Sequence, residues 1–102
     1  MLREVTKKEV METIKNGFHL VVFHAVWCGA CKMLRPELEK LASEDNVSIL
    51  TVNINENNEY AKEENVMSIP YILFYKDGVL VDKVVGSMPY AQLKEKITYL
   101  SK

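Results

Sequence analysis

The sequence predicts an α/β fold of three layers, with helices covering both faces of a central mixed sheet. Residues 18–26 and 47–53 contain apolar runs without the alternation of half-exposed strands, which is typical of central parallel strands buried on both faces. Segments with helical periodicity separate these runs, so right-handed crossovers join the strands. Near the C-terminus, Asp77-Gly78 stands between two strand-like segments and predicts an antiparallel hairpin that extends the same sheet.

Signals for the ends of elements organise the first half of the chain. Residues 2–5 form a short strand, and Thr6 precedes Glu9 with the spacing of a capping box, which opens a helix. Gly17 suits the left-handed end of that helix. After the next strand, a second helix extends from Cys28 to Glu44, and its inward residues are Leu34, Leu38 and Leu41.

The second half adds the rest of the sheet and a final helix. Strand 47–53 is followed by a short helix near 60–64, and strands 71–76 and 79–85 form the hairpin. Pro89 suits the start of the last helix, whose inward residues are Leu93, Ile97 and Leu100. We expect the first three strands to be parallel and the hairpin to be antiparallel.

Length and charge set the broad class of the protein. The chain has 102 residues, the length of one domain, so we expect a single domain over residues 1–102. With 13 basic and 14 acidic residues its net charge is -1, which predicts no nucleic-acid partner and no polybasic membrane patch. No apolar run approaches the roughly 20 residues of a membrane span, and charged residues from Arg3 onward interrupt any signal peptide. We expect a cytoplasmic monomer.

The chemistry is expected at the two cysteines, which lie in Trp27-Cys28-Gly29-Ala30-Cys31-Lys32. A disulfide that closes so short a loop stabilises little, so the thiols are reactive or bind metal. The strand-to-helix connection places Cys28 at a helix N-terminus, where free amides and the helix dipole favour the thiolate, and Lys32 adds a positive charge. We expect Cys28 to be the nucleophile and Cys31, one turn later and more buried, to be the resolving thiol of a two-step exchange.

A zinc half-site is the competing interpretation of the cysteine pair. A structural zinc site takes four ligands, and the chain has no second cysteine pair. His19 and His24 could complete such a site only if their strand bent sharply. We therefore expect no metal.

The cysteine motif resembles the active-site motif of the thioredoxin family, Trp-Cys-Gly-Pro-Cys-Lys, and the resemblance extends over the whole chain. Pro36 matches the proline inside the active-site helix, Ile69-Pro70 matches the dipeptide with the cis-proline that faces the cysteines, and Gly78 and Gly86 match two glycines of the closing hairpin. The resemblance implies the thioredoxin fold and a protein disulfide reductase that acts in electron transport and cell redox homeostasis. It implies no cofactor beyond the redox-active Cys28–Cys31 disulfide, and recharging by an NADPH-dependent thioredoxin reductase.

The resemblance also implies a substrate site beside Cys28. In the cis form Ile69 offers its backbone to an extended segment of the substrate. The residues expected to shape the site are Trp27, Gly29, Ala30, Lys32, Ile69 and Pro70. Those expected to line the groove are Trp27, Ile54, Ile69, Gly86, Ser87 and Met88. For Ile54 and Met88, ordinary packing is an equal alternative.

The sequence departs from the family pattern at positions that affect the deprotonation of Cys31 and the redox balance of the cysteine pair. Ala30 replaces the usual proline and supplies a backbone N–H near Cys28, so we expect a redox balance different from that of an Ala30→Pro variant. Val22 stands where the family has a buried aspartate and Thr51 where it has a lysine, so charge and counter-charge are lost together.

His24 replaces an aromatic residue of the family. It points to the same face of its strand as Val22, and the unperturbed pKa of an imidazole is about 6.5. His24 is therefore a candidate proton acceptor for Cys31, oriented by Asn55. The alternative is a packing residue satisfied by a neighbouring carbonyl.

Two other functions stay open on the sequence. An oxidase or isomerase would use the same thiols with a shifted balance, and the reduction potential separates it from a reductase. A binding subunit would use the same surface with idle thiols, and its activity would survive replacement of both cysteines by serine.

Overall fold

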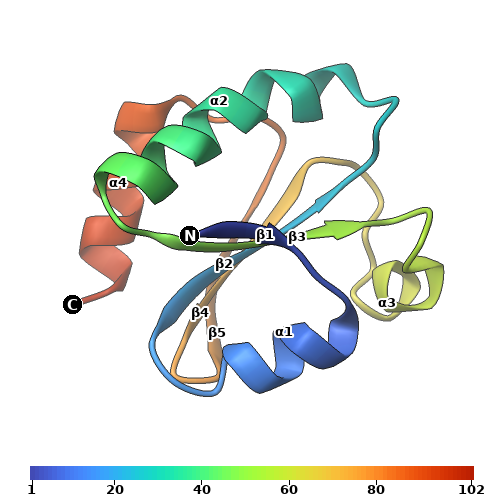
Figure 1. Ribbon diagram of the computed structural model, residues 1–102, viewed down its shortest axis with the longest axis horizontal. Helices are drawn as coiled ribbons and strands as arrows, with labels where there is room; N and C mark the ends of the chain where they lie inside the picture. Colours follow the sequence, from blue (N-terminus) through green and yellow to red (C-terminus); the bar gives the residue numbers. More distant parts are fainter.

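The computed structural model describes residues 1–102, and its elements follow the predicted order. The strands and helices are β1 (Leu2–Glu4), α1 (Lys7–Thr13), β2 (Phe18–His24), α2 (Gly29–Glu44), β3 (Ser48–Asn53), α3 (Asn58–Glu63), β4 (Tyr71–Lys76), β5 (Val79–Val85) and α4 (Tyr90–Leu100). Figure 1 shows the sheet between helices on both sides, with α1 below it and α2 above it. The three-layer prediction is confirmed.

The sheet has the strand order β1-β3-β2-β4-β5. Strands β1, β3 and β2 are parallel and β4 is antiparallel to β5, as predicted, and β4 also pairs with β2 in the antiparallel sense. Thr51 of β3 lies opposite Glu4 on one side and Val22 on the other. The carboxyl ends of β1, β2 and β3 therefore meet at one edge of the sheet, which is where the cysteine loop follows β2.

The core consists of one apolar cluster on each face of the sheet. The cluster under α1 and α3 is built around Phe23, whose ring centroid lies 5.0 Å from that of Tyr60 and 6.1 Å from that of Tyr71. The cluster under α2 and α4 contains the predicted inward residues Leu34, Leu38, Leu41, Leu93 and Ile97, with Leu100 packed against it. Because both faces are covered, the central strands lack alternation.

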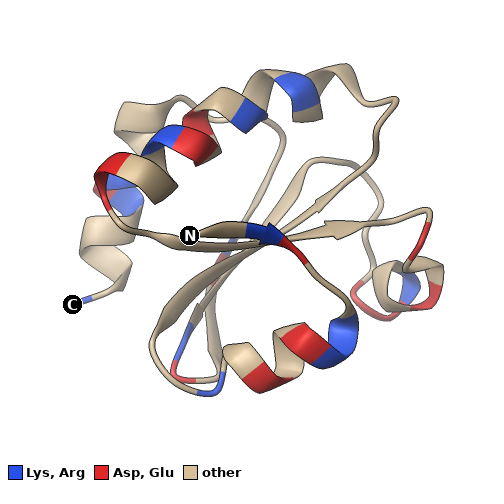
Figure 2. Ribbon diagram, in the orientation of Figure 1, with Lys and Arg blue, Asp and Glu red and all other residues tan.

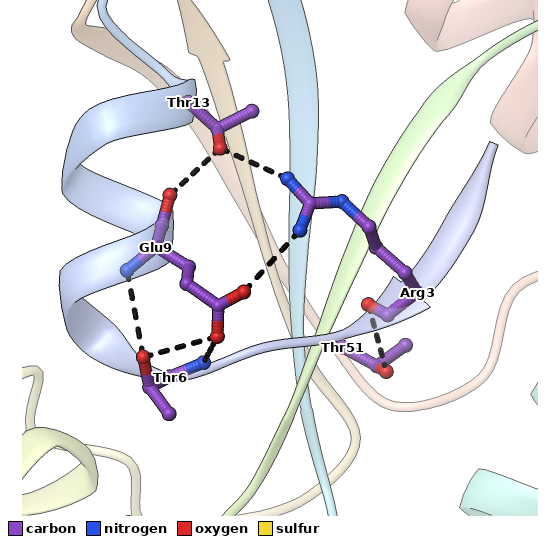
Figure 3. Close-up of polar contacts among 5 residues, drawn as sticks. All are labelled: Arg3, Thr6, Glu9, Thr13 and Thr51. Atoms are coloured by element: carbon purple, nitrogen blue, oxygen red, sulfur yellow. Dashed lines mark hydrogen bonds and ion pairs between the residues drawn. The ribbon is translucent and has the colours of Figure 1, made fainter.

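The capping box holds the end of β1 in place, as Figure 3 shows. Thr6 is the N-cap of α1, its backbone N–H donates to Glu9 Oε1 (3.0 Å), and the Glu9 backbone N–H lies 3.5 Å from Thr6 Oγ1. Arg3 reaches the same helix, with its guanidinium 3.4 Å from Glu9 Oε2 and donating to Thr13 Oγ1 (3.2 Å). Side chains alternate along a strand, so with Arg3 on the α1 face Glu4 lies on the α2 face.

Charged residues of both signs are distributed over the helices and loops, and the central strands carry few of them (Figure 2). None of the helices has the length and apolar character that a bilayer span requires. The tight turn of the hairpin has the left-handed backbone that its sequence predicted, with φ of 49° at Asp77 and 83° at Gly78.

An ionic cluster joins α2 to α4 and makes stability depend on pH. Tyr90 donates to Asp45 Oδ2 (2.5 Å), and Lys94 Nζ lies 3.2 Å from Asp45 Oδ1. The hydrogen bond from Tyr90, with a smaller contribution from Lys94, lowers the pKa of Asp45 below its ordinary 3.8 in spite of desolvation. A carboxyl group with a lowered pKa in the folded state stabilises the protein above its unfolded pKa, and this contribution is lost as the pH falls through the folded pKa.

We therefore expect Asp45→Asn to lower the free energy of unfolding at neutral pH and to remove part of the decline in stability below about pH 4. Urea denaturation of both proteins at a series of pH values measures this. The exposed Glu12→Gln serves as a control that keeps the wild-type profile. An Asp45→Asn profile parallel to the wild type through the acid range would contradict the assignment.

Candidate active site

The two cysteines lie where β2 passes into α2. Cys28 is the N-cap of α2, with an extended backbone (φ -92°, ψ 113°), and its Sγ accepts a hydrogen bond from the backbone N–H of Cys31 (3.1 Å). The two residues form a disulfide with their Cα atoms 5.2 Å apart. The amide bonded to the sulfur belongs to Cys31, whereas the sequence pointed to that of Ala30. One helical turn thus brings the two sulfurs together.

The local electrostatics favour a negative charge on Cys28. The first turn of α2 contains no acidic residue, and its free backbone N–H groups surround the N-cap position. Lys32, four residues after Cys28 in α2, is exposed. Sulfur at a helix N-terminus is the arrangement that lowers the pKa of a cysteine and makes it nucleophilic.

The relative burial of the two cysteines is the reverse of what the sequence predicted. Cys28 is 6% exposed, whereas Cys31 is half-buried. The reason is the loop before β4, which covers Cys28 and leaves its Sγ 3.7 Å from the carbonyl oxygen of Ile69. Cys31 instead adjoins a cavity of about 30 Å³ between α2 and the sheet. The assignment of Cys28 as nucleophile therefore depends on its position at the helix end.

The Ile69–Pro70 peptide bond is cis, as the family resemblance implied. Pro70 is buried, and its carbonyl oxygen accepts a hydrogen bond from the backbone N–H of Gly86 (2.8 Å). This bond holds the loop before β4 and the residues after β5 together beside Cys28. Ser87 follows as an exposed residue.

Only part of the expected groove is assembled. Ile54 and Ile69 both pack, partly buried, against the cluster under α1 and α3. Met88 packs against the other cluster and lines a cleft between β5 and α4, which favours the alternative of ordinary packing for this residue. The sheet separates these two clusters, which is why Met88 lies apart from Ile54. The cavities of the structure do not include one lined by Cys28 and Trp27.

Exposed apolar side chains flank the cysteine loop instead. Trp27 is 64% exposed, so it is not a core residue, and Val26 beside it is 69% exposed. Met33 in α2 and Met67 before the cis-proline are 71% and 91% exposed. Sequence reasoning missed the two methionines, although both lie within a few positions of Cys28 or Pro70.

A carboxylate from another strand lies beside the positions that depart from the family pattern. Val22 and Thr51 are buried, as expected for residues at the centre of the sheet. The Thr51 hydroxyl donates to Glu4 Oε1 (2.7 Å) and lies 3.3 Å from the carbonyl oxygen of Arg3. A negative charge thus reaches this region from β1. The aspartate–lysine pair is lost as expected, and the carboxylate of Glu4, which the sequence did not point to, lies in this region instead.

The same carboxylate holds His24. His24 Nε2 lies 2.8 Å from Glu4 Oε1, so its partner is neither Asn55 nor a backbone carbonyl. Asn55 is exposed, and its backbone N–H donates to Asn53. His19 lies at the other end of β2, where it contacts Ser48 (2.7 Å) and the carbonyl oxygen of Asn16 (2.6 Å). The histidines and cysteines do not converge on one metal site.

Glu4 is the residue of this region that sequence reasoning missed. The available signal was its place next to the capping box, because Thr6 fixes where β1 ends and therefore which residue lies at the carboxyl edge of the strand. The pairing of β1 with β3 was needed to place that edge beside Thr51 and His24.

The geometry agrees with comparisons to known proteins. The family model described as Thioredoxin matches residues 1–99. The chain is 44% identical over 96 residues to a thioredoxin of Staphylococcus saprophyticus, covering 92% of each chain, and 44% identical over 94 residues to one of Staphylococcus aureus, covering 90% of each.

Solved structures show the same fold. A mutant thioredoxin from Halobacterium salinarum superposes with a TM-score of 0.91 at 29% identity, covering 99% of this chain and 91% of that one. Mitochondrial thioredoxin 3 from Saccharomyces cerevisiae in its oxidized form superposes with a TM-score of 0.85 at 33% identity, covering 97% of this chain and 95% of that one. The predicted fold class is confirmed.

Proposed function

This chain belongs to the thioredoxin family, and from that membership we infer that it is a dithiol–disulfide oxidoreductase that reduces protein disulfides. The observation that carries the inference is the Cys28–Cys31 pair at disulfide distance, with Cys28 capping α2. A dithiol at a helix N-terminus has both the nucleophile and the second thiol that an exchange cycle needs.

The reaction proceeds in two exchanges. The Cys28 thiolate attacks one sulfur of the substrate disulfide, which forms a mixed disulfide and releases the other sulfur as a thiolate. Cys31 then loses its proton and attacks Cys28 Sγ. The bond between Cys28 and the substrate breaks, the electron pair leaves with the substrate sulfur, and the Cys28–Cys31 disulfide forms. Two electrons have moved to the substrate.

The remaining assignments are proposals that follow from the family. The protein is recharged by an NADPH-dependent thioredoxin reductase and carries electrons from it to protein disulfides, with no bound cofactor. Its place of action is the cytoplasm, where thiols are kept reduced. Ile69, Ser87 and the exposed Trp27 support a contact surface for the substrate beside Cys28.

The test is reduction of insulin disulfides with NADPH and a thioredoxin reductase. The wild type is expected to turn over, and the variant with both cysteines replaced by serine is expected to lose all activity above the background of the reductase. A measured reduction potential then separates a reductase from an oxidase. Activity that survives in the double variant would show that the thiols are idle and would refute the proposed function.

A further inference from the structure

A polar cluster lies behind the disulfide, on the face of the sheet that α2 covers. It consists of Glu4 in β1, His24 in β2 and Thr51 in β3, which the strand order β1-β3-β2 brings together. Glu4 Oε1 is its centre, because this one oxygen accepts from Thr51 Oγ1 (2.7 Å) and contacts His24 Nε2 (2.8 Å). The Thr51 hydroxyl is buried and thereby fixes the position of the carboxylate.

The contact with Glu4 determines which nitrogen of His24 is free. A carboxylate only accepts hydrogen bonds, so the hydrogen of the neutral imidazole lies on Nε2. Nδ1 is then the nitrogen that can take up a further proton. A carboxylate that holds an imidazole in one tautomer, and stabilises the imidazolium that forms, is the arrangement of a general base with its orienting group.

A small cavity connects this cluster with the second cysteine. His24, Thr51 and Cys31 line the same cavity of about 30 Å³, which has room for about one water molecule. Arg35 also lines it, but a guanidinium stays protonated, and its Nε lies 3.1 Å from Glu39. His24 is therefore the side chain at this cavity with a free nitrogen that can accept a proton.

We propose that His24 accepts the proton of Cys31 when the mixed disulfide is resolved, and that Glu4 is the positioning residue that orients His24. The inference rests on the proposed function, because it concerns the second exchange of that reaction. The proton leaves Cys31 Sγ and reaches His24 directly or through the cavity. The resulting Cys31 thiolate attacks Cys28 Sγ, the bond to the substrate breaks, and the departing substrate thiolate takes a proton from solvent or from the imidazolium.

The charges that face His24 come from two elements. Glu4 contacts His24 from β1 at 2.8 Å, while Arg35 of α2 lines the same cavity as His24. Arg35 is itself paired with Glu39 across one turn of α2. The carboxylate of Glu4 is therefore the charged group in direct contact with His24.

The two exchanges can be followed separately with dithiobis(nitrobenzoate), whose thiolate is coloured. The reduced protein releases one nitrobenzoate thiolate when Cys28 attacks and a second when Cys31 resolves the mixed disulfide. In stopped flow with excess reagent the second release becomes rate-limiting. Because this leaving group needs no proton, the second phase reports the deprotonation and attack of Cys31.

We expect His24→Asn to leave the first release unchanged and to slow the second about a hundredfold near pH 7, the lower end of what general bases contribute. Without the base, the second rate should rise about tenfold per pH unit towards the ordinary cysteine pKa of about 8.5, whereas the wild-type rate should level off at a lower pH. Glu4→Gln keeps the shape but removes the charge, and is expected to slow the second release about fivefold and to move its inflection to lower pH.

His19→Asn and Glu12→Gln are matched controls and should behave as the wild type in both phases. A wild-type second phase in His24→Asn or in Glu4→Gln overturns the proposal, and so does equal slowing of both phases. If His24→Asn does not fold, the nearly isosteric Glu4→Gln decides the outcome by the same criteria. Absence of the first release in the wild type would instead refute the proposed function.

Discussion

Replacing Cys31 with serine is expected to stop turnover and to leave the protein covalently joined to its substrate. Cys28 keeps its place at the N-terminus of α2 in this variant, so its attack and the first release of a thiolate should persist. The mixed disulfide then has no neighbouring thiol to resolve it. An intramolecular thiol acts at an effective concentration far above that of any added thiol, so turnover should fall by about 10³-fold or more.

Intact-mass measurement after reaction with dithiobis(nitrobenzoate) shows which cysteine is the nucleophile. Cys31→Ser should carry one nitrobenzoate adduct, and Cys28→Ser should form its adduct more slowly than Cys31→Ser does. The comparison separates the effect of position at the helix end from that of exposure, because Cys31 is more exposed than Cys28. If exposure determined reactivity, Cys28→Ser would form the adduct faster than Cys31→Ser, and the assignment of the two roles would have to be exchanged.

Replacing Phe23 with alanine is expected to cause a large loss of stability. Phe23 is fully buried in β2 and packs against Tyr60 and Tyr71. Truncation of a buried phenylalanine removes its burial energy and leaves a cavity, which together cost about 3–5 kcal/mol. Since a domain is stable by about 5–15 kcal/mol, the melting temperature should fall by about 15 °C or more.

Thermal and urea unfolding of the oxidised proteins measure this effect. Phe18→Ala is the matched control, because Phe18 begins the same strand and is only half-buried, so about 1 kcal/mol is expected there. Equal losses in the two variants would mean that the cluster under α1 and α3 is not the principal core. At a temperature where the variant is folded, Phe23→Ala should keep its thiol chemistry. The cysteines lie at the start of α2, and Phe23 belongs to the cluster on the opposite face of the sheet.

Most of the fold follows from signals that span a few residues. Thr6 and Glu9 open α1 by bonding each other, and Asp77-Gly78 adopts the left-handed backbone that the hairpin needs. The uninterrupted apolar runs predict strands covered on both faces, which the two core clusters confirm. The cysteine motif predicts its own placement at a helix end because the strand and helix patterns flank it directly.

The surroundings of the cysteines needed the folded chain. Cys28 is covered by the loop around Ile69, 41 residues away, and this reversed the predicted order of burial. Glu4 contacts His24, which is 20 residues away in the sequence, and Thr51, which is 47 residues away. Which strands are neighbours decides such contacts, and β1 and β2, which are consecutive in sequence, are separated in the sheet by β3.

The elements, their order and the reacting pair follow from local signals in the sequence, because capping, turn geometry and periodicity are properties of short segments. The tertiary structure alone decided that Glu4, and not Asn55, is the partner of His24. Insertion of β3 between β1 and β2 places the three side chains of that cluster at one sheet edge. Side chains from separate strands meet only when the core packs and fixes the strand order, and no short segment contains that information.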